Sequence, residues 1–452
     1  MSEQGPETLR SVSSRWTVTL SILGVAMLVL YRIAVHSKEV ADIVWFLKLV
    51  LIQLIIYFGV AWLSLRAKDS KQFLAFGLIF AALFRLSILF SPPYLSDDIY
   101  RYVWDGRVQS SGINPYRYIP ADESLVKLRD EKIYPNINRR DYARTIYPPV
   151  TEGAFLLITR LSESVTWMKA AMVGFEAIAV WALIQLLVSF GLARQRVLIY
   201  AWHPLIVWEF AGSGHVDALA IAFIALALLA RRKRCETLTG FLLACATCVK
   251  LFPVVLFPAF YERRSWKMPL AFVGTILVTY LPYLSVGPLG VLGFLPGYAN
   301  ERGMMSGEQF FLLTVARRLF SANLPASGYL IFTVAVLAIL SLWLMWDQRS
   351  NEIRYLRSGL ILASTFLVLL APHFSWYFTW LILFLCFIPS IPVFYLTAAS
   401  FLLYLTWIND TPDRVFILKS IIFVPFLILV VLMIWLRRRF RYSFGGVGRP
   451  NL

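Results

Sequence analysis

The sequence is poor in charged residues, and poorest in acidic ones. Only 15% of its 452 residues are charged, and 43 Lys and Arg outnumber 26 Asp and Glu. At the same time 59% of the residues are hydrophobic, and the mean hydropathy is +0.68. A soluble chain of this composition would expose large apolar patches to water. The shortage of charge therefore excludes a soluble enzyme and indicates a polytopic membrane protein.

Cysteine and histidine are also scarce, with four of each. Cys245 and Cys248 lie one helical turn apart in an apolar run, and Cys235 adjoins a basic cluster. We therefore expect packed free thiols and no disulfide framework. No set of ligands has the spacing of a structural zinc site, so no metal of that kind is predicted.

Motifs for nucleotide-dependent chemistry are missing as well. The chain has no glycine-rich phosphate loop, no nucleophile elbow and no soluble stretch large enough for a nucleotide-binding domain. A nucleotide sugar or ATP would have no evident place to bind. A phosphate-activated donor dissolved in the membrane fits this composition better.

Apolar runs fill most of the chain, several of them near the roughly 20 residues that cross a bilayer. They lie at 15–35, 43–65, 72–91, 166–190, 196–211, 215–231, 237–261, 267–285, 327–347, 356–371, 374–390, 392–407 and 415–437. The expected fold is an all-α polytopic bundle of roughly 11–13 transmembrane helices. Two segments are expected not to cross: 237–261 as a hairpin bent near Lys250, and 149–161 as an interfacial or re-entrant piece.

The net charge of +17 is distributed as short basic clusters between apolar runs, which is a topology signal and not a nucleic-acid surface. If the runs are threaded in order, these clusters share one side, which should be the cytoplasm. We therefore expect a multi-pass protein of the bacterial inner membrane with both termini cytoplasmic. The clusters are Arg66/Lys68/Lys71, Arg194/Arg196, 231–234, Arg263/Arg264/Lys267, Arg349/Arg354/Arg357 and 437–441.

The polar mass then falls on the opposite, outer face of one membrane-embedded domain spanning 1–452. Its main parts are a first loop (91–149) and a second loop (286–325). Together they should form a small helical cap. An amphipathic helix is expected at 119–133, with Asp122 or Glu123 near its start. The glycines of the second loop suggest a mobile segment that gates the acceptor.

The first loop opens with two neighbouring acids, Asp97 and Asp98, at the start of a helix expected at 96–111. Ser96 is the expected N-cap, and Gly112 ends the helix. Such a pair can deprotonate a hydroxyl or hold a divalent cation. The alternative is a surface helix whose acids stabilise its own N-terminus and pair with Arg101.

Other residues on the outer face favour an anionic ligand. Lys250 lies between two apolar half-spans, where an ammonium needs water or an anion, and a lipid-linked phosphate is a natural partner. The alternatives are snorkelling or pairing with an acid elsewhere. His215 and Asp217 follow two glycines, and His373 precedes Trp376 and Tyr377 in another tight connection. Both histidines are candidates for ligand contact.

These blocks resemble the C-type glycosyltransferase superfamily, and more narrowly the bacterial polyprenol-phosphate-mannose-dependent mannosyltransferases of glycosyltransferase family 87. The resemblance covers about residues 70 to 390. The blocks that carry it are Ser96–Arg107, Gly112–Tyr116, Ile146–Pro149, Gly214–Asp217, Lys250–Pro253 and His373–Tyr377.

The resemblance implies transfer of a hexose, most often mannose, from a polyprenyl-phosphate donor to a hydroxyl of a glycan or glycolipid, with inversion. The first acid of the motif would be the general base, so Asp97 is the first candidate and Asp98 the second. Lys250, Arg101 and His373 would bind the donor phosphate. The remaining candidates, for sugar or acceptor binding, are Tyr102, Trp104, Asp105, Tyr147, His215, Asp217, Trp376 and Tyr377.

Two alternatives stay open. A lipid or glycolipid transporter would also have many spans and a buried lysine, but it should show internal repeats and polar groups at mid-membrane. An oligosaccharide ligase with a lipid-diphosphate donor would need more cations on the outer face. No cofactor is predicted beyond a divalent cation at Asp97/Asp98, and that cation is itself an open question.

Overall fold

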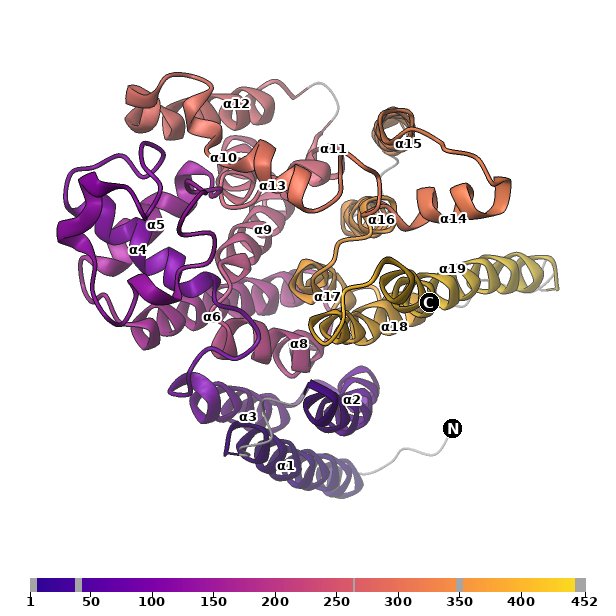
Figure 1. Cartoon of the computed structure of the whole chain (residues 1–452). Helices are drawn as coiled ribbons and strands as arrows, with labels where there is room; N and C mark the ends of the chain where they lie inside the picture. Colours follow the sequence, from indigo (N-terminus) through magenta and orange to yellow (C-terminus); the bar gives the residue numbers. More distant parts are fainter. Residues whose placement is uncertain (1–5, 37–42, 263–264, 347–352, 444–452) are drawn as a thin grey trace.

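The computed structural model describes residues 6–36, 43–262, 265–346 and 353–443, and within these ranges the chain forms helices and no strand. Most helices gather in one bundle, while α4 and α5 lie on its flank (Figure 1). The predicted all-α fold is confirmed.

Long and short helices are both found along the chain. The α-helices are α1 (Pro6–His36), α2 (Ile43–Arg66), α3 (Lys71–Leu89), α4 (Asp98–Ser110), α5 (Pro149–Thr159), α6 (Val165–Ser189), α7 (Leu198–Ala201), α8 (Pro204–Val207), α9 (Asp217–Arg232), α10 (Glu236–Thr247), α11 (Phe257–Phe260), α12 (Lys267–Tyr280), α13 (Leu295–Glu301), α14 (Phe311–Phe320), α15 (Ala326–Trp346), α16 (Arg354–Leu370), α17 (Thr379–Leu385), α18 (Ile391–Ala399) and α19 (Pro412–Ser443). One π-helix, η5 (Trp208–Gly212), and the 3-10 helices complete the chain: η2 (Glu123–Leu128), η3 (Tyr134–Asn136), η4 (Arg194–Val197), η6 (Phe252–Leu256), η7 (Leu281–Val286), η8 (Gly290–Leu292), η9 (Ser375–Phe378) and η10 (Ser400–Trp407).

Seven described helical segments are long and apolar enough to cross a membrane: Arg15–Val35, Ile43–Arg66, Lys71–Leu89, Val165–Ser189, Lys267–Val286, Ala326–Trp346 and Pro412–Arg437. The other apolar runs either form single shorter helices, α9 with 16 residues and α16 with 17, or are interrupted. The run at 196–211, for example, is divided into η4, α7, α8 and η5. Interrupted helices at membrane depth occur where the backbone is buried in protein or lines a polar cavity. The chain is thus multi-pass, with seven long candidates and several broken segments.

The run at 237–261 forms the expected hairpin. It breaks after Thr247 and continues through η6 and α11. Its two ends meet again, because Ser265 Oγ donates to Glu236 Oε2 at 2.6 Å and Arg231 pairs with Glu262. The hairpin therefore returns to the side on which it began, and Lys250 lies at its tip. Helix α5, with 11 residues, is likewise too short to cross.

Ion pairs and other contacts bring several basic connections together at one end of the bundle, which we call the basic end. Arg194 pairs with Asp69 at 3.0 Å, and Arg232 Nη2 donates to the carbonyl of Ser189 at 2.7 Å. Arg231 also lies over the ring of Tyr355, 5.5 Å from its centroid. These contacts agree with the predicted grouping for the clusters around Arg194, 231–234 and Arg354, whereas no described contact tests it for 437–441. Arg263, Arg264 and Arg349 lie outside the described residues.

Tight packing of α4 against α5 builds the cap. A Cβ at Gly106 would lie 2.5 Å from the carbonyl oxygen of Phe155, so only glycine allows the two helices to come this close. The predicted continuous helix at 119–133 is wrong: the segment contains only η2. Asp122 caps it by accepting the amide of Ser124 at 2.9 Å, and the chain then turns extended at Arg129.

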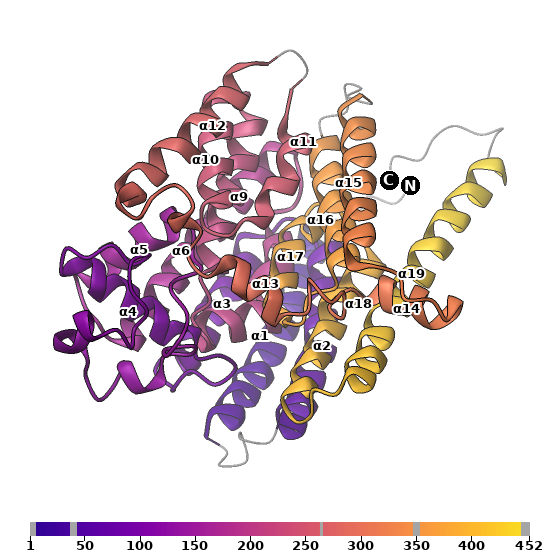
Figure 2. The ribbon, with the colours of Figure 1, turned by 45° about the horizontal axis from the view of Figure 1, so that its top comes forward.

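The second loop docks on the first (Figure 2). The amide of Phe294 donates to the carbonyl of Thr145 at 3.0 Å, and Arg139 pairs with Glu301 at 2.7 Å. Helix α13 is thereby placed beside the cap, with its C-terminal end near the start of α4. The mobility and gating predicted for this loop stay a prediction.

Candidate active site

The two acids lie where α4 begins. Asp97 is the N-cap residue and Asp98 the first helical residue. Ser96 was expected at the N-cap, and that prediction is wrong by one position: its Oγ accepts the amide of Asp98 at 3.2 Å from one residue further out. Gly112 follows the helix with φ +78°, as expected for a glycine that ends a helix.

Asn138, from the far end of the first loop, bridges the two carboxylates. Its Nδ2 donates to Asp97 Oδ1 at 2.9 Å and to Asp98 Oδ1 at 2.6 Å. Adjacent carboxylates repel each other, and one amide group that donates to both reduces this repulsion. The pair is therefore held in a fixed arrangement from two places in the sequence.

The electrostatic surroundings of Asp98 raise its pKa. Burial is the main cause, and the charge of Asp97 adds to it. The hydrogen bond from Asn138 and the charges of Lys250 and Arg139 act in the opposite direction and reduce the rise. Asp98 thus keeps its proton to a higher pH than an ordinary aspartate, which is common for carboxyl groups in enzyme clefts.

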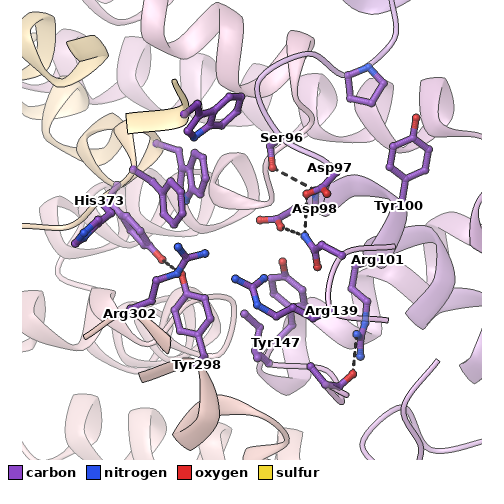
Figure 3. Close-up of a pocket in the computed structure, with 18 of the residues that line it drawn as sticks. Ser96, Asp97, Asp98, Tyr100, Arg101, Arg139, Tyr147, Tyr298, Arg302 and His373 are labelled. Carbon is purple, nitrogen blue, oxygen red and sulfur yellow. Dashed lines mark hydrogen bonds between the residues drawn. The ribbon is translucent and has the colours of Figure 1, made fainter. Parts of the chain in front are cut away.

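A cavity of about 710 Å³ opens above the pair. Figure 3 shows the acids on one wall and Arg139, Tyr298 and Arg302 facing them from the others. The lining comes from the first loop, the hairpin tip, the second loop and the connections after α16 and η10. The predicted residues that line it are Asp97, Asp98, Arg101, Tyr147, Lys250, His373, Trp376 and Tyr377.

Lys250 is held by a carboxylate and an aromatic ring. Its Nζ lies 2.5 Å from Asp217 Oδ2 and 5.0 Å from the centroid of the Tyr377 ring. Asp217, predicted to contact the sugar or acceptor, lies behind the lysine and outside the cavity lining. Of the readings left open for Lys250, pairing with an acid is therefore observed, and the lysine still faces the cavity.

Arg101 lines the cavity, but its guanidinium points away from the acid pair (Figure 3). Its Nε donates to Asp105 at 2.8 and 3.0 Å, and its Nη1 donates to the carbonyl of Ala143 at 3.0 Å. Both partners of the pair are almost fully buried. These bonds fix the first loop onto α4, so Arg101 is a structural support for the acids as well as a wall residue.

His373 lies at the boundary between the cavity and α19. Its Nδ1 is 3.3 Å from Lys419 Nζ, and Lys419 also donates to the carbonyl of Gln309 at 2.6 Å. Burial lowers the pKa of His373 to about 3, assisted by the charges of Lys419 and Arg302. The imidazole is therefore neutral at physiological pH and can act as a hydrogen-bond donor or acceptor, but not as a cation.

Four residues predicted to bind the sugar or acceptor are buried behind the cavity: three belong to α4, and the fourth lies in the connection between η5 and α9. Tyr102 stacks on Phe155, Trp104 packs against Tyr134, and Asp105 pairs with Arg101. His215 is fully buried and stacks on Trp376 with ring centroids 4.2 Å apart. These side chains support residues of the lining and do not form part of it.

Several residues of the lining were not singled out from the sequence, among them the polar residues Asn138, Arg139, Tyr298 and Arg302, which face the acids or contact them. The Asn138/Arg139 pair follows the aromatic Tyr134 in a turn-rich stretch, which was a usable signal for an ordered, ligand-facing loop. Tyr298 and Arg302 are one helical turn apart near the C-terminal end of α13. Nothing in the sequence places that helix opposite the acids.

The acid pair offers a divalent cation little support from the described residues. No group of three or more His, Cys, Asp or Glu side chains with metal-site geometry occurs among them. Asn138 also directs its amide N–H groups at both carboxylates, where a cation would need free oxygen lone pairs. A cation at Asp97/Asp98 stays a prediction to be tested. The four cysteines are free, as expected.

Comparison with known proteins places the chain in a family. Residues 12–262, which include the acid pair, Asn138 and Lys250, match the family described as alpha-(1->6)-mannopyranosyltransferase, N-terminal domain. The chain is also 22% identical over 316 residues to alpha-(1->6)-mannopyranosyltransferase A of Mycobacterium tuberculosis (strain H37Rv). That similarity covers 65% of this chain and 61% of the relative's length. With more than half of its length matched, the chain belongs to the alpha-(1->6)-mannopyranosyltransferase family, as its resemblance to the C-type mannosyltransferases predicted.

Proposed function

We propose that this protein transfers mannose from a polyprenyl-phosphate donor to a hydroxyl group of a glycan or glycolipid at the outer face of the bacterial inner membrane. The observation that carries the proposal is the single cavity that joins the Asp97/Asp98 pair to Lys250, Arg139 and Arg302. Carboxylates suit the activation of a hydroxyl, and cations suit a departing phosphate. The family and the relative named for mannosyl transfer support the sugar.

The chemistry is a single displacement. A carboxylate of the pair accepts the proton of the acceptor hydroxyl while its oxygen forms a bond to C1 of the sugar. The bond from C1 to the phosphate oxygen breaks, its electron pair stays on that oxygen, and polyprenyl phosphate leaves. Attack from the face opposite the phosphate inverts C1. Asp97 is the first candidate for the base because it is the first acid of the motif and the more exposed of the two.

The raised pKa of Asp98 is compatible with either role. A general base works best when its pKa approaches the working pH, so a raised pKa increases the basicity of Asp98 itself. If Asp97 is the base, Asp98 stabilises its position through the shared bond to Asn138. The two readings differ in which Asn variant abolishes turnover.

The separation of basic and acidic features supports the orientation. The basic end gathers Arg194, Arg231 and Arg232, and cytoplasmic loops carry such surpluses. Each of α3 and α9 connects that end with the cavity: α3 ends just before Asp97, and α9 begins at Asp217. An outward-facing cavity follows, with the N- and C-terminal segments on the cytoplasmic side.

The test is a transfer assay in membranes that contain the protein. Labelled polyprenyl-phosphate mannose, polyprenyl-phosphate glucose and nucleotide sugars are offered in parallel, with and without EDTA. We expect incorporation from polyprenyl-phosphate mannose, and a loss of about 1,000-fold or more for the variant that lacks the base. The anomeric configuration of the product, read by NMR, should be opposite to that of the donor.

Asp141→Asn is the matched control, because Asp141 is an exposed acid of the same loop outside the cavity lining. Normal turnover in this variant beside loss in Asp97→Asn or Asp98→Asn supports the proposal. Transfer from nucleotide sugars alone would contradict the donor class. Lipid movement across vesicles without any sugar transfer would favour the transporter alternative.

A further inference from the structure

Among the positively charged side chains of the cavity that are at least partly buried, Arg302 differs in how its charge is held. Three others are bonded to carboxylates. For the buried Nε of Arg302, by contrast, the structure describes no hydrogen-bond partner, and none of the ion pairs found in the described ranges includes this residue. The three neutralised pairs are Arg101–Asp105, Arg139–Glu301 and Lys250–Asp217.

Aromatic rings hold the guanidinium of Arg302 in place instead. Its Cζ lies 4.4 Å from the centroid of the Phe374 ring and 5.2 Å from that of Tyr298. The face of an aromatic ring attracts a cation without neutralising it. The guanidinium is therefore held without being neutralised by a carboxylate, and Figure 3 shows it on the side of the cavity that faces Asp98.

The ring beneath Arg302 is itself fixed from the protein core. Phe374 stacks on Trp376 with centroids 4.2 Å apart and an interplanar angle of 8°. Trp376 stacks in turn on His215, whose Nε2 lies 3.3 Å from Glu209 Oε2. The buried His215 therefore supports the stack of Trp376 and Phe374 that positions Arg302.

Arg302 also marks the boundary between polar and apolar space. A second, smaller cleft of about 50 Å³ adjoins the cavity, and both are lined by Arg302, Tyr298 and His373. The far side of the cleft is apolar and is formed largely by α16. Its apolar lining residues are Phe252, Met304, Phe366, Leu367, Leu370 and Pro372.

We propose that Arg302 binds the phosphate of the lipid donor and that the adjoining cleft receives the first part of its isoprenoid chain. The inference rests on the proposed function, because it assigns one end of that donor to one place in the cavity. In a polyprenyl phosphate, the charged phosphate is joined to the apolar chain at the ester oxygen. Arg302 lies at the corresponding boundary in the protein, between the polar cavity and the apolar cleft. When C1 leaves, Arg302 stabilises the charge that remains on the phosphate.

The experiment measures binding apart from turnover. Purified protein in nanodiscs is titrated with polyprenyl phosphate, which is the leaving group, and with uncharged polyprenol. We expect Arg302→Gln to weaken binding of the phosphate by about 100-fold and to leave binding of polyprenol unchanged. Arg302→Lys should recover part of the affinity, because it restores the charge but not the planar donors. Arg117→Gln, at an exposed arginine of the first loop outside the cavity lining, is the matched control.

The proposed role of the cleft is tested by a substitution that fills it with a larger side chain. Leu367→Trp should lower kcat/KM for a long-chain donor at least 10-fold more than for a donor with a single isoprene unit. Ile331→Trp, on the exposed face of α15, should affect neither donor. Arg302→Gln that binds polyprenyl phosphate as tightly as the parent overturns the inference. If Arg302→Gln does not fold, Arg302→Met takes its place, and full affinity of this variant for polyprenyl phosphate overturns the inference. Equal effects of Leu367→Trp on both donors also overturn it.

Failure of this inference and failure of the proposed function give different results. A parent protein that transfers mannose from the lipid donor, beside an Arg302→Gln variant that does so equally well, refutes only the role of Arg302. A parent protein that neither binds polyprenyl phosphate nor consumes its mannosyl ester refutes both.

Discussion

The carbonyl of Thr145 accepts the amide of Phe294 at 3.0 Å, although 149 positions separate the two residues. This bond joins the loop that carries the acids to the loop that carries Arg302. Gly293 makes the contact possible, because its φ is +55° and a Cβ there would lie 1.9 Å from the Thr145 oxygen. The cavity has walls from both loops only because position 293 is a glycine, which allows the second loop to dock on the first.

Gly293→Ala should separate the two loops and lower turnover about 10-fold to 100-fold, since the second loop would lose its place opposite the acids. The measurement is kcat/KM beside limited proteolysis, which should cut the second loop faster. Gly274→Ala, within α12, is the control because its Cβ would meet no atom within 4 Å. Unchanged turnover in Gly293→Ala would show that the loops can stay docked without this contact.

Asn138→Ala should move the acidic limb of the pH–rate profile to higher pH. The hydrogen bond from Asn138 lowers the pKa of Asp98, so its loss raises that pKa further. If Asp98 is the base, it then keeps its proton to a higher pH and cannot accept another, so activity falls first on the acidic side. Asn136→Ala, at an exposed position two residues earlier, should leave the profile unchanged. A uniform loss at all pH values would instead indicate a positional effect.

Asp98→Asn should stabilise the protein at neutral pH while impairing it as an enzyme. Because the folded state raises the pKa of Asp98, the charged form is disfavoured on folding. That cost is present above the raised pKa and disappears as the pH falls below the ordinary range for aspartate. Thermal unfolding in detergent should show a gain for Asp98→Asn at pH 7 and almost none near pH 4. An equal gain at both pH values would contradict this explanation.

Asp217→Asn should destabilise the hairpin tip, because Lys250 would lose the carboxylate 2.5 Å from its Nζ. Removal of one partner of a buried ion pair typically costs about 3 kcal/mol or more. Lys250→Met in the same protein should return part of the loss, since no unpaired charge is left. A double-mutant cycle of unfolding midpoints measures the coupling. Additive losses would mean that the pair contributes nothing to stability.

Local patterns predicted the parts of the fold that local physics controls. The acids after the third apolar run, the break at Lys250 and the shortness of α5 were all visible in the sequence and are found in the structure. Each depends on residues a few positions apart: a glycine or proline, a charge in an apolar run, or a run too short to cross. The family assignment relied on the same local blocks and is confirmed.

Tertiary contacts decided the rest. The helix expected at 119–133 is divided because Asp130 turns to Arg107 and to the amides of Ile133 and Tyr134, interactions that no helical pattern reveals. The polar residues of α4 were expected to face a ligand. The helix is instead covered by α5, α6 and the rest of the first loop, so Tyr102 and Trp104 became core.

Long-range placement is also why Arg139 and Arg302 were missed. Arg139 stands beside Arg140, and Arg302 follows Glu301 in a glycine-rich loop, so neither has a neighbour in the sequence that marks it as a site residue. Their roles arise only when α13 docks beside α4. Sequence patterns could identify the acids because the pair is a local motif, whereas the cationic wall is assembled from separate loops.

The length of the hairpin formed by α10, η6 and α11 determines the position of Lys250 relative to the basic end. Both legs of the hairpin are joined at the basic end, through Glu236 and Ser265, so its length sets how far Lys250 extends toward the cavity, where Asp217 holds it. Removal of about one full turn from α10 shortens that reach by about 5.4 Å, keeps the orientation of the tip and leaves the number of crossings unchanged. The depth of one positive charge can therefore vary between related chains without any change in topology.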